Sequence, residues 1–318
     1  MMSTPLSVIQ TIEHPVFTKH NLNVQIKRDD LIHHVVSGNK WRKLKYNLLN
    51  LKQRKYAGAI TFGGSYSNHI HAFAYACKQH NIPCVGVIRG EPQYANNFTL
   101  SWARYWGMQC FFVDRQTFRR RFDADYIEEL TQKFPNHLVI PEGGSNTDAI
   151  RGVAEIMDEL QSQTTFDTLM VPVGSGGTLA GLITGDSKPH TSKHNILGVA
   201  VLKQADYLVS TINQLLSEEA KKHKNWQLLT QFHFGGYGKM LKEDIERLKQ
   251  INQQTGIIFE PTYSGKMMLA LMDLIEQDYF QARERVVLVH TGGLQGLGGM
   301  IEQGKLTPYD WPEPEKAP

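Results

Sequence analysis

The 318-residue sequence predicts an α/β protein whose strands form mainly parallel sheets. From about Ala57 onward, short apolar runs alternate with amphipathic stretches, which is the pattern of consecutive βαβ units. Most of the apolar runs are continuous, as is typical of strands that helices cover on both faces. A chain of this length can bury a substantial core and can form two ordinary domains or one large domain.

Seven of the apolar runs are predicted to be strands. In chain order they cover residues 59–62, 84–88, 110–113, 138–140, 169–173, 196–201 and 286–290. Between them, apolar residues recur on one helical face, as they do in residues 68–80. Further helices are predicted at residues 148–161, 205–220, 243–255 and 265–277.

The composition gives no reason to expect a nucleic acid or a membrane as a partner. Lys and Arg number 34 against 31 Asp and Glu, so the net charge is only +3. No run approaches the roughly 18 apolar residues of a membrane span, and the N-terminus lacks the pattern of a signal peptide. We therefore expect a cytoplasmic protein.

The cysteines predict neither a disulfide framework nor a metal site. Cys77, Cys84 and Cys110 are odd in number, unevenly spaced and surrounded by apolar residues. Disulfide-rich domains need paired cysteines, and zinc sites need close, regular spacings. We expect buried free thiols and no bound metal.

Four glycine-containing segments follow apolar runs, at the strand ends where open α/β sheets bind ligands. The first is Gly63-Gly64-Ser65-Tyr66-Ser67-Asn68-His69. Its glycines allow a ligand to approach the backbone, and Ser67 and Asn68 place polar groups at a helix N-terminus suited to an anion. The alternative is an ordinary helix cap, but a cap needs only one such residue.

The second segment is Gly174-Ser175-Gly176-Gly177-Thr178, which opens a helix near Leu179. A dinucleotide-binding fingerprint would need glycine at Leu179, and a Walker A loop would need Gly-Lys-Ser/Thr. The loop instead offers backbone N–H groups and hydroxyls in a cup sized for one phosphate group. The alternative is a glycine-rich turn that only serves helix–sheet packing.

The remaining two segments carry a tyrosine and hydroxyl residues. Glu260-Pro261-Thr262-Tyr263-Ser264-Gly265-Lys266 follows an apolar run at residues 257–259 that we expect to be a strand. His290-Thr291-Gly292-Gly293 follows the last predicted strand. Tyr263 and His290 could each be buried residues with satisfied hydrogen bonds and no chemical role.

The stretch Ser37-Gly38-Asn39-Lys40-Trp41-Arg42-Lys43 contains two candidate reactive amines. A phosphate cup and glycine loops at sheet ends, together with a lysine, could hold an aldehyde cofactor as a Schiff base. Burial at a sheet edge lowers the pKa of a lysine and so favours the neutral, nucleophilic amine. Lys40 is the better candidate, and Lys43 is expected on the solvated or the phosphate-facing side of the following helix.

Together these motifs resemble the pyridoxal-phosphate enzymes of the tryptophan synthase β type, and within them the D-cysteine desulfhydrase and 1-aminocyclopropane-1-carboxylate deaminase group. The resemblance extends from Lys27 to Gly293. It implies fold type II: two open, twisted, mainly parallel α/β domains with pyridoxal 5'-phosphate in the cleft. Residues 1–42 and 153–318 would form the large cofactor-binding domain, and residues 43–152 a small inserted domain. The resemblance also implies a homodimer.

The same resemblance implies a role for each motif. Lys40 would form the Schiff base and later take the α-proton of the substrate. The cofactor phosphate would bind to Gly174, Ser175, Gly176, Gly177 and Thr178. Asn68 would lie near the phenolic oxygen of the cofactor and would bind the substrate carboxylate together with Ser67 and His69. Tyr237 and Tyr263 would line the substrate pocket and position groups or transfer protons.

Two positions depart from the deaminase pattern. Where this chain has Ser264, deaminases are expected to have a glutamate that faces the pyridine nitrogen, and they tend to have leucine in place of Thr291. A carboxylate keeps that nitrogen protonated, whereas a hydroxyl of Ser264 or Thr291 leaves it largely neutral. Opening a cyclopropane needs the stronger electron sink, and loss of a thiolate does not. The sequence therefore favours β-elimination from D-cysteine, which gives pyruvate, ammonia and sulfide.

Other interpretations stay open from sequence alone. The chain could be a 1-aminocyclopropane-1-carboxylate deaminase, or a dehydratase or racemase of D-serine. It could also be a relative that binds the cofactor without turnover and uses Glu142 and the following Gly143-Gly144-Ser145-Asn146 as a binding surface. The missing glycine at Leu179 argues against a nicotinamide oxidoreductase.

Overall fold

A computed structural model describes residues 6–188 and 194–317 of the chain. In these residues the strands form two sheets, one with the order β1-β2-β10-β7-β8-β9 and one with the order β5-β4-β3-β6. Every pair of neighbouring strands is parallel except β1 and β2. The predicted α/β class with mainly parallel sheets is confirmed.

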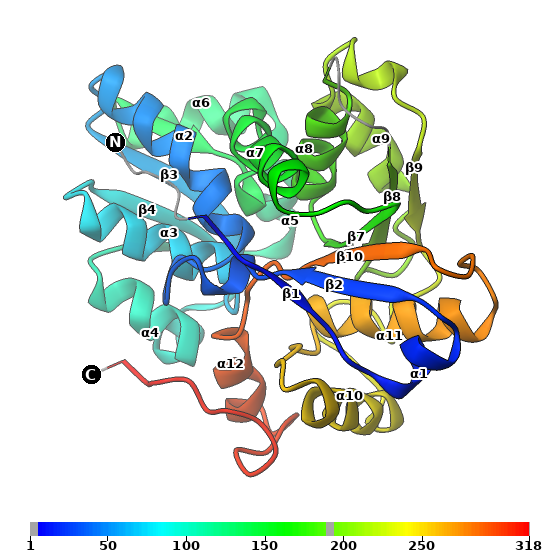
Figure 1. Cartoon of the computed structure of the whole chain (residues 1–318). Coiled ribbons are helices and arrows are strands. Elements are labelled where there is room, and N and C mark those ends of the chain that lie inside the picture. Colours follow the sequence, from blue (N-terminus) through cyan, green and yellow to red (C-terminus); the bar gives the residue numbers. More distant parts are fainter. Residues whose placement is uncertain (1–5, 189–193, 318) are drawn as a thin grey trace.

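The larger sheet takes its strands from both ends of the chain (Figure 1). Its strands are β1 (Ile9–Thr11), β2 (Asn23–Lys27), β7 (Thr168–Val173), β8 (Asn195–Ala200), β9 (Trp226–Leu229) and β10 (Arg285–Val289). One face packs against α7 (Thr147–Gln163), α8 (Gly177–Asp186) and α9 (Tyr207–Leu215). The other face packs against α1 (Pro15–Lys19), α10 (Lys242–Thr255) and α11 (Ser264–Glu276).

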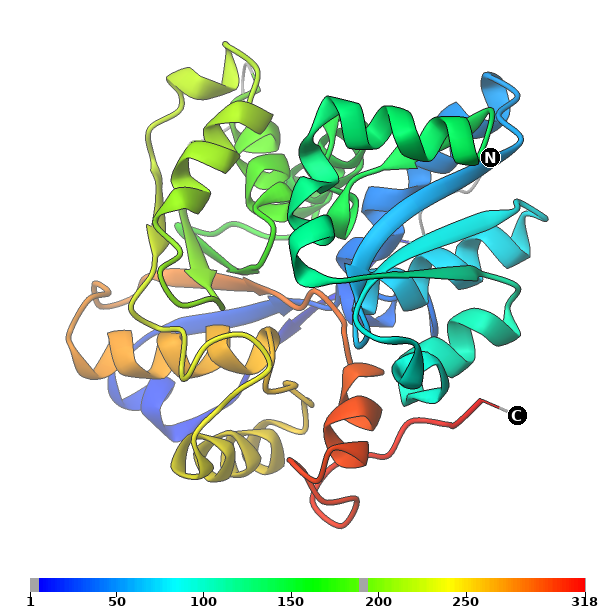
Figure 2. The same cartoon turned by 180° about the vertical axis from the view of Figure 1, so that it is seen from behind.

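The smaller sheet lies beside the larger one and is built from the first half of the chain (Figures 1 and 2). Its strands are β3 (Gly58–Gly64), β4 (Cys84–Arg89), β5 (Gln109–Val113) and β6 (His137–Ile140). Helices α2 (Asn39–Gln53), α3 (Asn68–Gln79) and α4 (Phe98–Tyr105) cover one face. The other face packs against α5 (Arg115–Arg119) and α6 (Ala124–Lys133), and α12 (Gly296–Glu302) contacts α4.

The seven predicted strands are all present, with ends within two residues of those expected. Strands β1, β2 and β9 are not apparent from the apolar pattern because they are short or mix polar and apolar residues. The helix predicted at residues 205–220 is wrong beyond Leu215, where α9 ends. Oγ of Ser217 accepts a hydrogen bond from the N–H of Ala220, and this local bond starts a separate short turn.

The strand expected at residues 257–259 is also wrong. The N–H of Phe259 donates to Oδ1 of Asn252 at 3.0 Å, and its carbonyl oxygen accepts from Nδ2 of the same side chain at 3.3 Å. The Asn252 amide thus takes the place that a neighbouring strand would fill. The segment before Glu260 is a connection between α10 and α11 instead of a sheet strand.

Helices α2 and α7 cross at the two expected domain boundaries. A Cβ atom on Gly152 would lie only 2.0 Å from the carbonyl oxygen of Arg42, so the crossing requires glycine. The fully buried guanidinium of Arg42 pairs with Asp29 at 2.6 Å and with Glu159 at 2.7 Å. Buried charges need such partners, and this network ties the start of α2 to α7. The division at residues 42/43 and 152/153 stays a prediction.

Candidate active site

Helix α2 begins against the end of β10, and this contact positions Lys40. Gly38, just before the helix, has a positive φ of 63°, which favours glycine. A Cβ atom on Gly38 would lie 2.0 Å from the carbonyl oxygen of Thr291. The N–H of Asn39 donates to that same oxygen at 3.3 Å. A larger residue at position 38 would therefore push Lys40 away from the sheet edge.

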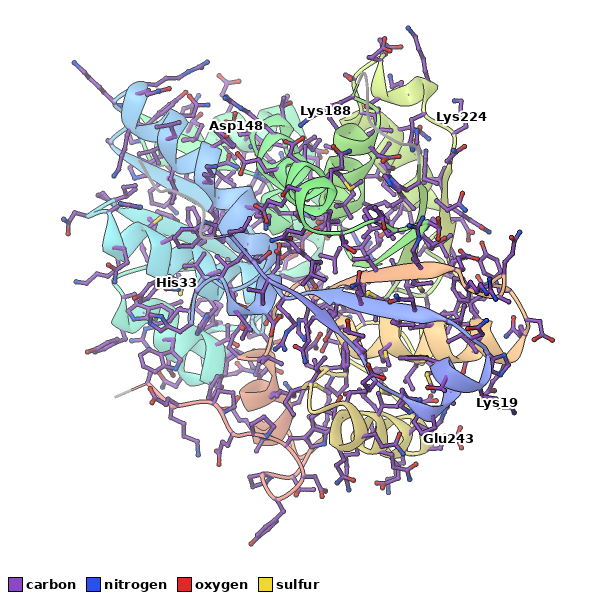
Figure 3. The ribbon with its side chains drawn as sticks, in the orientation of Figure 1. Lys19, His33, Asp148, Lys188, Lys224 and Glu243 are labelled. Atoms are coloured by element: carbon purple, nitrogen blue, oxygen red, sulfur yellow. The ribbon has the colours of Figure 1, made fainter. Side chains whose placement is uncertain are left out.

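The side chain of Lys40 is half-buried, and its amine is largely desolvated. Its Nζ donates a hydrogen bond to Oδ1 of Asn39 at 2.8 Å. Burial lowers the pKa of Lys40 to about 8, and the negative charge of Glu260 acts in the opposite direction. Lys19 and Lys224, by contrast, lie at the outer edge of the molecule (Figure 3). At neutral pH Lys40 has a larger neutral fraction than such surface lysines, as a nucleophile requires.

Lys43 lies one turn further along α2 and is also buried. Its Nζ donates to the carbonyl oxygen of Gly143 and to Oγ of Ser145, both at 3.2 Å. Burial is the main reason that its pKa lies well below the usual value. A Cβ atom on Gly177 would lie 3.2 Å from this amine. Lys43 therefore faces the loop at residues 174–178, and the solvated position, one of two expected, is wrong.

The loop at residues 174–178 joins β7 to the N-terminus of α8. Gly176 has a positive φ of 84°, and within the described chain no side chain caps this helix. Its first N–H groups can therefore bind an anion. A Cβ atom on Gly177 would lie 2.4 Å from Oγ of Ser145, so a methyl group would fill the space above the loop. The absence of a side chain there suits a phosphate group.

Hydroxyl groups complete the surroundings of this loop. Oγ of Ser175 lies 2.7 Å from Oγ of Ser145. Oγ1 of Thr178 accepts a hydrogen bond from Nδ2 of Asn39 at 2.9 Å. Because Asn39 also accepts a hydrogen bond from Lys40, one hydrogen-bonded chain joins the Lys40 amine to the loop.

The loop after β3 contributes Asn68 to the site. Oγ of Ser67 accepts the N–H of Ile70 at 3.3 Å, so this hydroxyl acts as a helix cap, the alternative role expected for it. The amide of Asn68 lies across from the segment after β10. Cβ atoms on Gly293 and Gly296 would lie 2.9 Å from its Nδ2 and 3.1 Å from its Oδ1, respectively.

His69 is buried beneath the same loop. Its Nε2 lies 2.7 Å from Oγ1 of Thr61, and its Nδ1 has no hydrogen-bond partner within the described part of the chain. Burial, and then the charges of Lys40 and Lys43, hold its pKa well below the usual value. His69 is therefore a neutral imidazole near the two amines.

The two tyrosines that were predicted to line the substrate pocket lie together beside the loop at residues 174–178. The hydroxyl of Tyr263 donates to the hydroxyl of Tyr237 at 3.1 Å, and their rings meet edge to face. Cε1 of Tyr263 would lie 3.2 Å from a Cβ atom on Gly174. Burial raises the pKa of Tyr263, and desolvation of its hydroxyl end raises that of Tyr237, whose side chain is otherwise partly exposed. Both hydroxyls are therefore protonated at neutral pH and can donate or relay protons.

Glu260 is a buried carboxyl group to which the sequence pattern gave no role. Its two oxygens accept the N–H groups of Thr262, Tyr263 and Ser264 at 2.7, 2.7 and 2.8 Å. Burial nevertheless raises its pKa to about 7. The signal in the sequence is an acidic residue just before the start of a helix, where it can bind the first N–H groups.

The two hydroxyl residues expected near a pyridine nitrogen have different surroundings. Ser264 is fully buried, and its Oγ accepts the N–H of Glu260 at 2.9 Å and lies 3.4 Å from Oε1 of the same residue. The hydroxyl of Thr291 makes no hydrogen bond to another described residue. Of the two hydroxyls, that of Thr291 is therefore the one available to hydrogen-bond a ligand.

The loop at residues 142–146, after β6, also belongs to this site. It supplies the Gly143 carbonyl and the Ser145 hydroxyl that contact Lys43. Sequence reasoning connected this loop only with a non-catalytic relative. The available signal was its Gly-Gly-Ser sequence, which repeats that of Gly63-Gly64-Ser65 after another strand of the same sheet.

The sequence matches the family described as "Pyridoxal-phosphate dependent enzyme" over residues 3–292. The chain belongs to this family. It is therefore an enzyme that depends on pyridoxal phosphate. The buried amine of Lys40 fits the aldehyde of this cofactor. The glycine-lined loop beside Lys43 fits its phosphate.

Three similar proteins carry related names. A protein of Pyrococcus horikoshii, provisionally named a 1-aminocyclopropane-1-carboxylate deaminase, is 30% identical over 92% of this chain and 90% of its own. A bifunctional D-cysteine desulfhydrase/1-aminocyclopropane-1-carboxylate deaminase of Arabidopsis thaliana is 29% identical over 90% of this chain and 76% of its own. The crystal structure of a homologue of the deaminase superimposes with a TM-score of 0.81 and 28% identity, covering 94% of this chain and 93% of that chain.

Neither a metal centre nor a membrane segment is found in the parts of the chain that the structure describes. Within residues 6–188 and 194–317, no group of three or more His, Cys, Asp or Glu side chains is placed to hold a metal ion. In the same residues no helix has both the length and the apolar character needed to cross a bilayer.

Proposed function

We propose that this protein is a pyridoxal-phosphate lyase that eliminates the β-substituent of a small amino acid. D-cysteine is the preferred substrate, and pyruvate, ammonia and sulfide are the products. The observation that carries the proposal is the amine of Lys40, whose pKa is lowered to about 8 and which is linked through Asn39 to the loop at residues 174–178. The names of the Arabidopsis and Pyrococcus relatives support this reaction class.

Each group of residues has a part in this reaction. The bound cofactor supplies an aldehyde that captures amines and a ring that stabilises negative charge at the α-carbon. The amine of Lys40 would hold that aldehyde and would take the α-proton of the substrate. Lys43 and the loop at residues 174–178 would hold the phosphate. Tyr237 and Tyr263 would position the β-substituent and supply a proton to it.

The loop after β3 is proposed to hold the substrate carboxylate. Asn68 would bind it together with backbone N–H groups near Ser67 and His69 at the start of α3, where the helix favours negative charge. The imidazole of His69 is neutral and would not neutralise the carboxylate. Alignment by this loop would set the Cα–H bond toward Lys40.

Thr291 is proposed to face the pyridine nitrogen. Its hydroxyl makes no hydrogen bond to another described residue, whereas the hydroxyl of Ser264 accepts a hydrogen bond from the N–H of Glu260. A neutral hydroxyl supports a weaker electron sink than a carboxylate would. This favours departure of a thiolate over cleavage of a carbon–carbon bond.

A deaminase is the second candidate, and one observation favours it. The carboxyl group of Glu260 lies 3.4 Å from Oγ of Ser264, so an acid is present near the position where deaminases are expected to carry one. Its raised pKa of about 7 allows it to exchange a proton near neutral pH.

We further propose that residues 43–152 form a separate small domain and that the enzyme is a cytoplasmic homodimer.

Product analysis tests the function. Purified enzyme is incubated with D-cysteine, L-cysteine, D-serine and 1-aminocyclopropane-1-carboxylate, and keto acid, ammonia and sulfide are measured. Sulfide and pyruvate from D-cysteine alone support the main proposal, and 2-oxobutanoate from the cyclopropane amino acid supports the deaminase. No product from any substrate would indicate a cofactor-binding relative. Lys40→Ala must lose both turnover and the visible absorbance of the lysine-bound cofactor.

A further inference from the structure

Residues 233–239 form a loop that carries Tyr237 into the site. The loop belongs to the segment between β9 and α10, which crosses α11 (Figure 2). Gly235, Gly236 and Gly238 all have positive φ angles, of 96°, 93° and 62°, and glycine leaves the backbone free to change such angles. A loop of this composition needs contacts with the rest of the protein to keep one position.

Lys266 provides the buried contact of this loop. It lies on α11, and its side chain is fully buried. Its Nζ donates to the carbonyl oxygen of Gly236 and, at 3.3 Å, to that of Val201, just after β8. Among the described residues, no carboxylate forms an ion pair with this amine. The amine therefore joins α11 and the end of β8 to the backbone of the loop.

The buried position of Lys266 is unfavourable for its charge. Desolvation lowers the pKa of Lys266 to about 8, although the charge of Glu260 acts in the opposite direction. The next residues along α11, Met267, Met268 and Leu269, are buried and apolar. A methionine at position 266 would avoid the cost of desolvating an amine. What the amine provides in return is a pair of hydrogen bonds to backbone carbonyls, one of which belongs to the loop.

The start of α11 contacts Tyr237 at both of its ends. Tyr263, directly before the helix, donates to the hydroxyl of Tyr237 at 3.1 Å. Lys266, three residues later, binds the carbonyl group of Gly236, which forms the peptide bond to Tyr237. The side chain of Tyr237 is 43% exposed, yet its hydroxyl end is desolvated. A side chain with one face in solvent and its polar end turned inward is suited to cover a site.

We propose that the loop at residues 233–239 is a lid over the substrate pocket and that Lys266 is the positioning residue that holds this lid closed. The inference rests on the proposed function, because it places Tyr237 beside the β-substituent. With the lid closed, Tyr237 meets Tyr263 and water is kept from the substrate. Without the amine of Lys266, the glycine-rich loop opens more often and the hydroxyl of Tyr237 leaves its position.

Hydrogen exchange of the holoenzyme tests the hold of Lys266 on the loop and needs no turnover. The N–H groups of Gly236 and Lys239 are bonded within the loop and report its opening. In Lys266→Met we expect the amides of residues 233–239 to exchange at least about tenfold faster than in the wild type, the effect of one lost charge-assisted hydrogen bond. The amides of residues 174–178 should keep the wild-type rate. Unchanged exchange in the loop would overturn the inference.

Two further variants complete this test. Lys305 contacts the same loop, since its Nζ donates to the carbonyl oxygen of Gly238 at 3.2 Å, but this lysine is exposed to solvent. Water can replace such a bond, so Lys305→Met should keep the wild-type exchange and activity. Lys266→Gln keeps a neutral N–H donor and should restore part of the protection, and it provides the measurement if the methionine variant does not fold. Equal acceleration in Lys305→Met and Lys266→Met would contradict a special role for the buried amine.

Turnover of D-cysteine tests whether the lid acts on the reaction through Tyr237. Lys266→Met and Tyr237→Phe should each lower kcat/KM about 10- to 100-fold. The double variant should lose little more than the worse single variant, because both changes remove the same hydroxyl from its position. In Lys266→Met the visible absorbance of the lysine-bound cofactor should be unchanged. Losses that multiply in the double variant would show that Lys266 does not act by positioning Tyr237.

The two measurements separate the inference from the proposed function. A wild-type enzyme that releases no sulfide from D-cysteine would refute the elimination. The exchange of residues 233–239 in Lys266→Met would still show in that case whether Lys266 holds the loop, because it requires no reaction.

Discussion

The side-chain amide of Asn39 donates a hydrogen bond to Oγ1 of Thr178 at 2.9 Å, and both residues are buried. Oδ1 of the same Asn39 accepts a hydrogen bond from Lys40 at 2.8 Å. One side chain therefore fixes the distance between the amine of Lys40 and the loop at residues 174–178. This link joins α2, which packs on the smaller sheet, to α8, which packs on the larger sheet.

Removing either partner of this bond should weaken cofactor binding. We expect Asn39→Ala and Thr178→Val each to raise the dissociation constant for pyridoxal phosphate about 5- to 20-fold, the effect of one lost buried hydrogen bond. The double variant should lose little more than the worse single variant, because both changes break the same contact. Cofactor affinity is measured by quenching of protein fluorescence. Losses that multiply in the double variant would show that the two residues act independently.

Capture of the cofactor by the apoenzyme should depend on pH through Lys40. Only the neutral amine attacks an aldehyde, and burial lowers the pKa of Lys40 to about 8. The bimolecular rate should therefore rise with pH and level off above about pH 8. Stopped-flow absorbance over pH 6 to 10 measures this rate, with an exposed-lysine peptide as the reference. A rate that still climbs steeply at pH 10 would show an unperturbed lysine.

The sequence predicts the sheet framework well because buried parallel strands are continuous apolar runs. Strands β3 to β8 and β10 therefore follow from the pattern. The run at residues 257–259 is equally apolar but forms no strand, since the Asn252 side chain satisfies the backbone of Phe259. Apolar character reports burial, and it does not identify the group that accepts each backbone hydrogen bond.

The site is predictable only in part for a similar reason. Glycine loops and Lys40 have local signals, and the resemblance gives them roles. The position of Lys43 depends on Gly143 and Ser145, about 100 residues later in the chain. From sequence alone, Glu260 is an ordinary acidic residue before the start of a helix. Only its burial in the fold raises its pKa to about 7. Such properties arise from tertiary packing, which no local pattern specifies.

Glu260 should make the stability of the cofactor-free protein fall as pH rises. Its pKa is about 7 in the folded state, against 4.5 for an ordinary glutamate. The folded state therefore holds a proton that the unfolded chain has lost, so the contribution of Glu260 to the free energy of unfolding is greatest below pH 4.5 and is lost as pH rises through 7. This carboxyl group accounts for a loss of about 3 kcal/mol between pH 4.5 and 8.

Urea unfolding at pH 5 and pH 8 checks this contribution. In Glu260→Gln the free energy of unfolding should change less between the two pH values than in the wild type. Glu128→Gln, which alters an exposed glutamate on α6, should behave like the wild type. The same pH slope in Glu260→Gln and wild type would show that the buried carboxyl group is already ionised at pH 5.

Lys43 should make the apoenzyme respond to phosphate. Burial of its amine holds the pKa well below 10.5, so charging Lys43 costs stability until an anion binds beside it. Millimolar inorganic phosphate should therefore raise the Tm of the wild-type apoenzyme by several degrees, by mass action. In Lys43→Met the apoenzyme should start with a higher Tm, and phosphate should raise that Tm little.

Lys45→Met provides the control. It removes an amine that pairs with Glu155, away from the loop at residues 174–178, and should keep the wild-type response. Thermal unfolding in phosphate and in chloride of equal ionic strength measures both effects, and a full phosphate response in Lys43→Met would place the anion elsewhere.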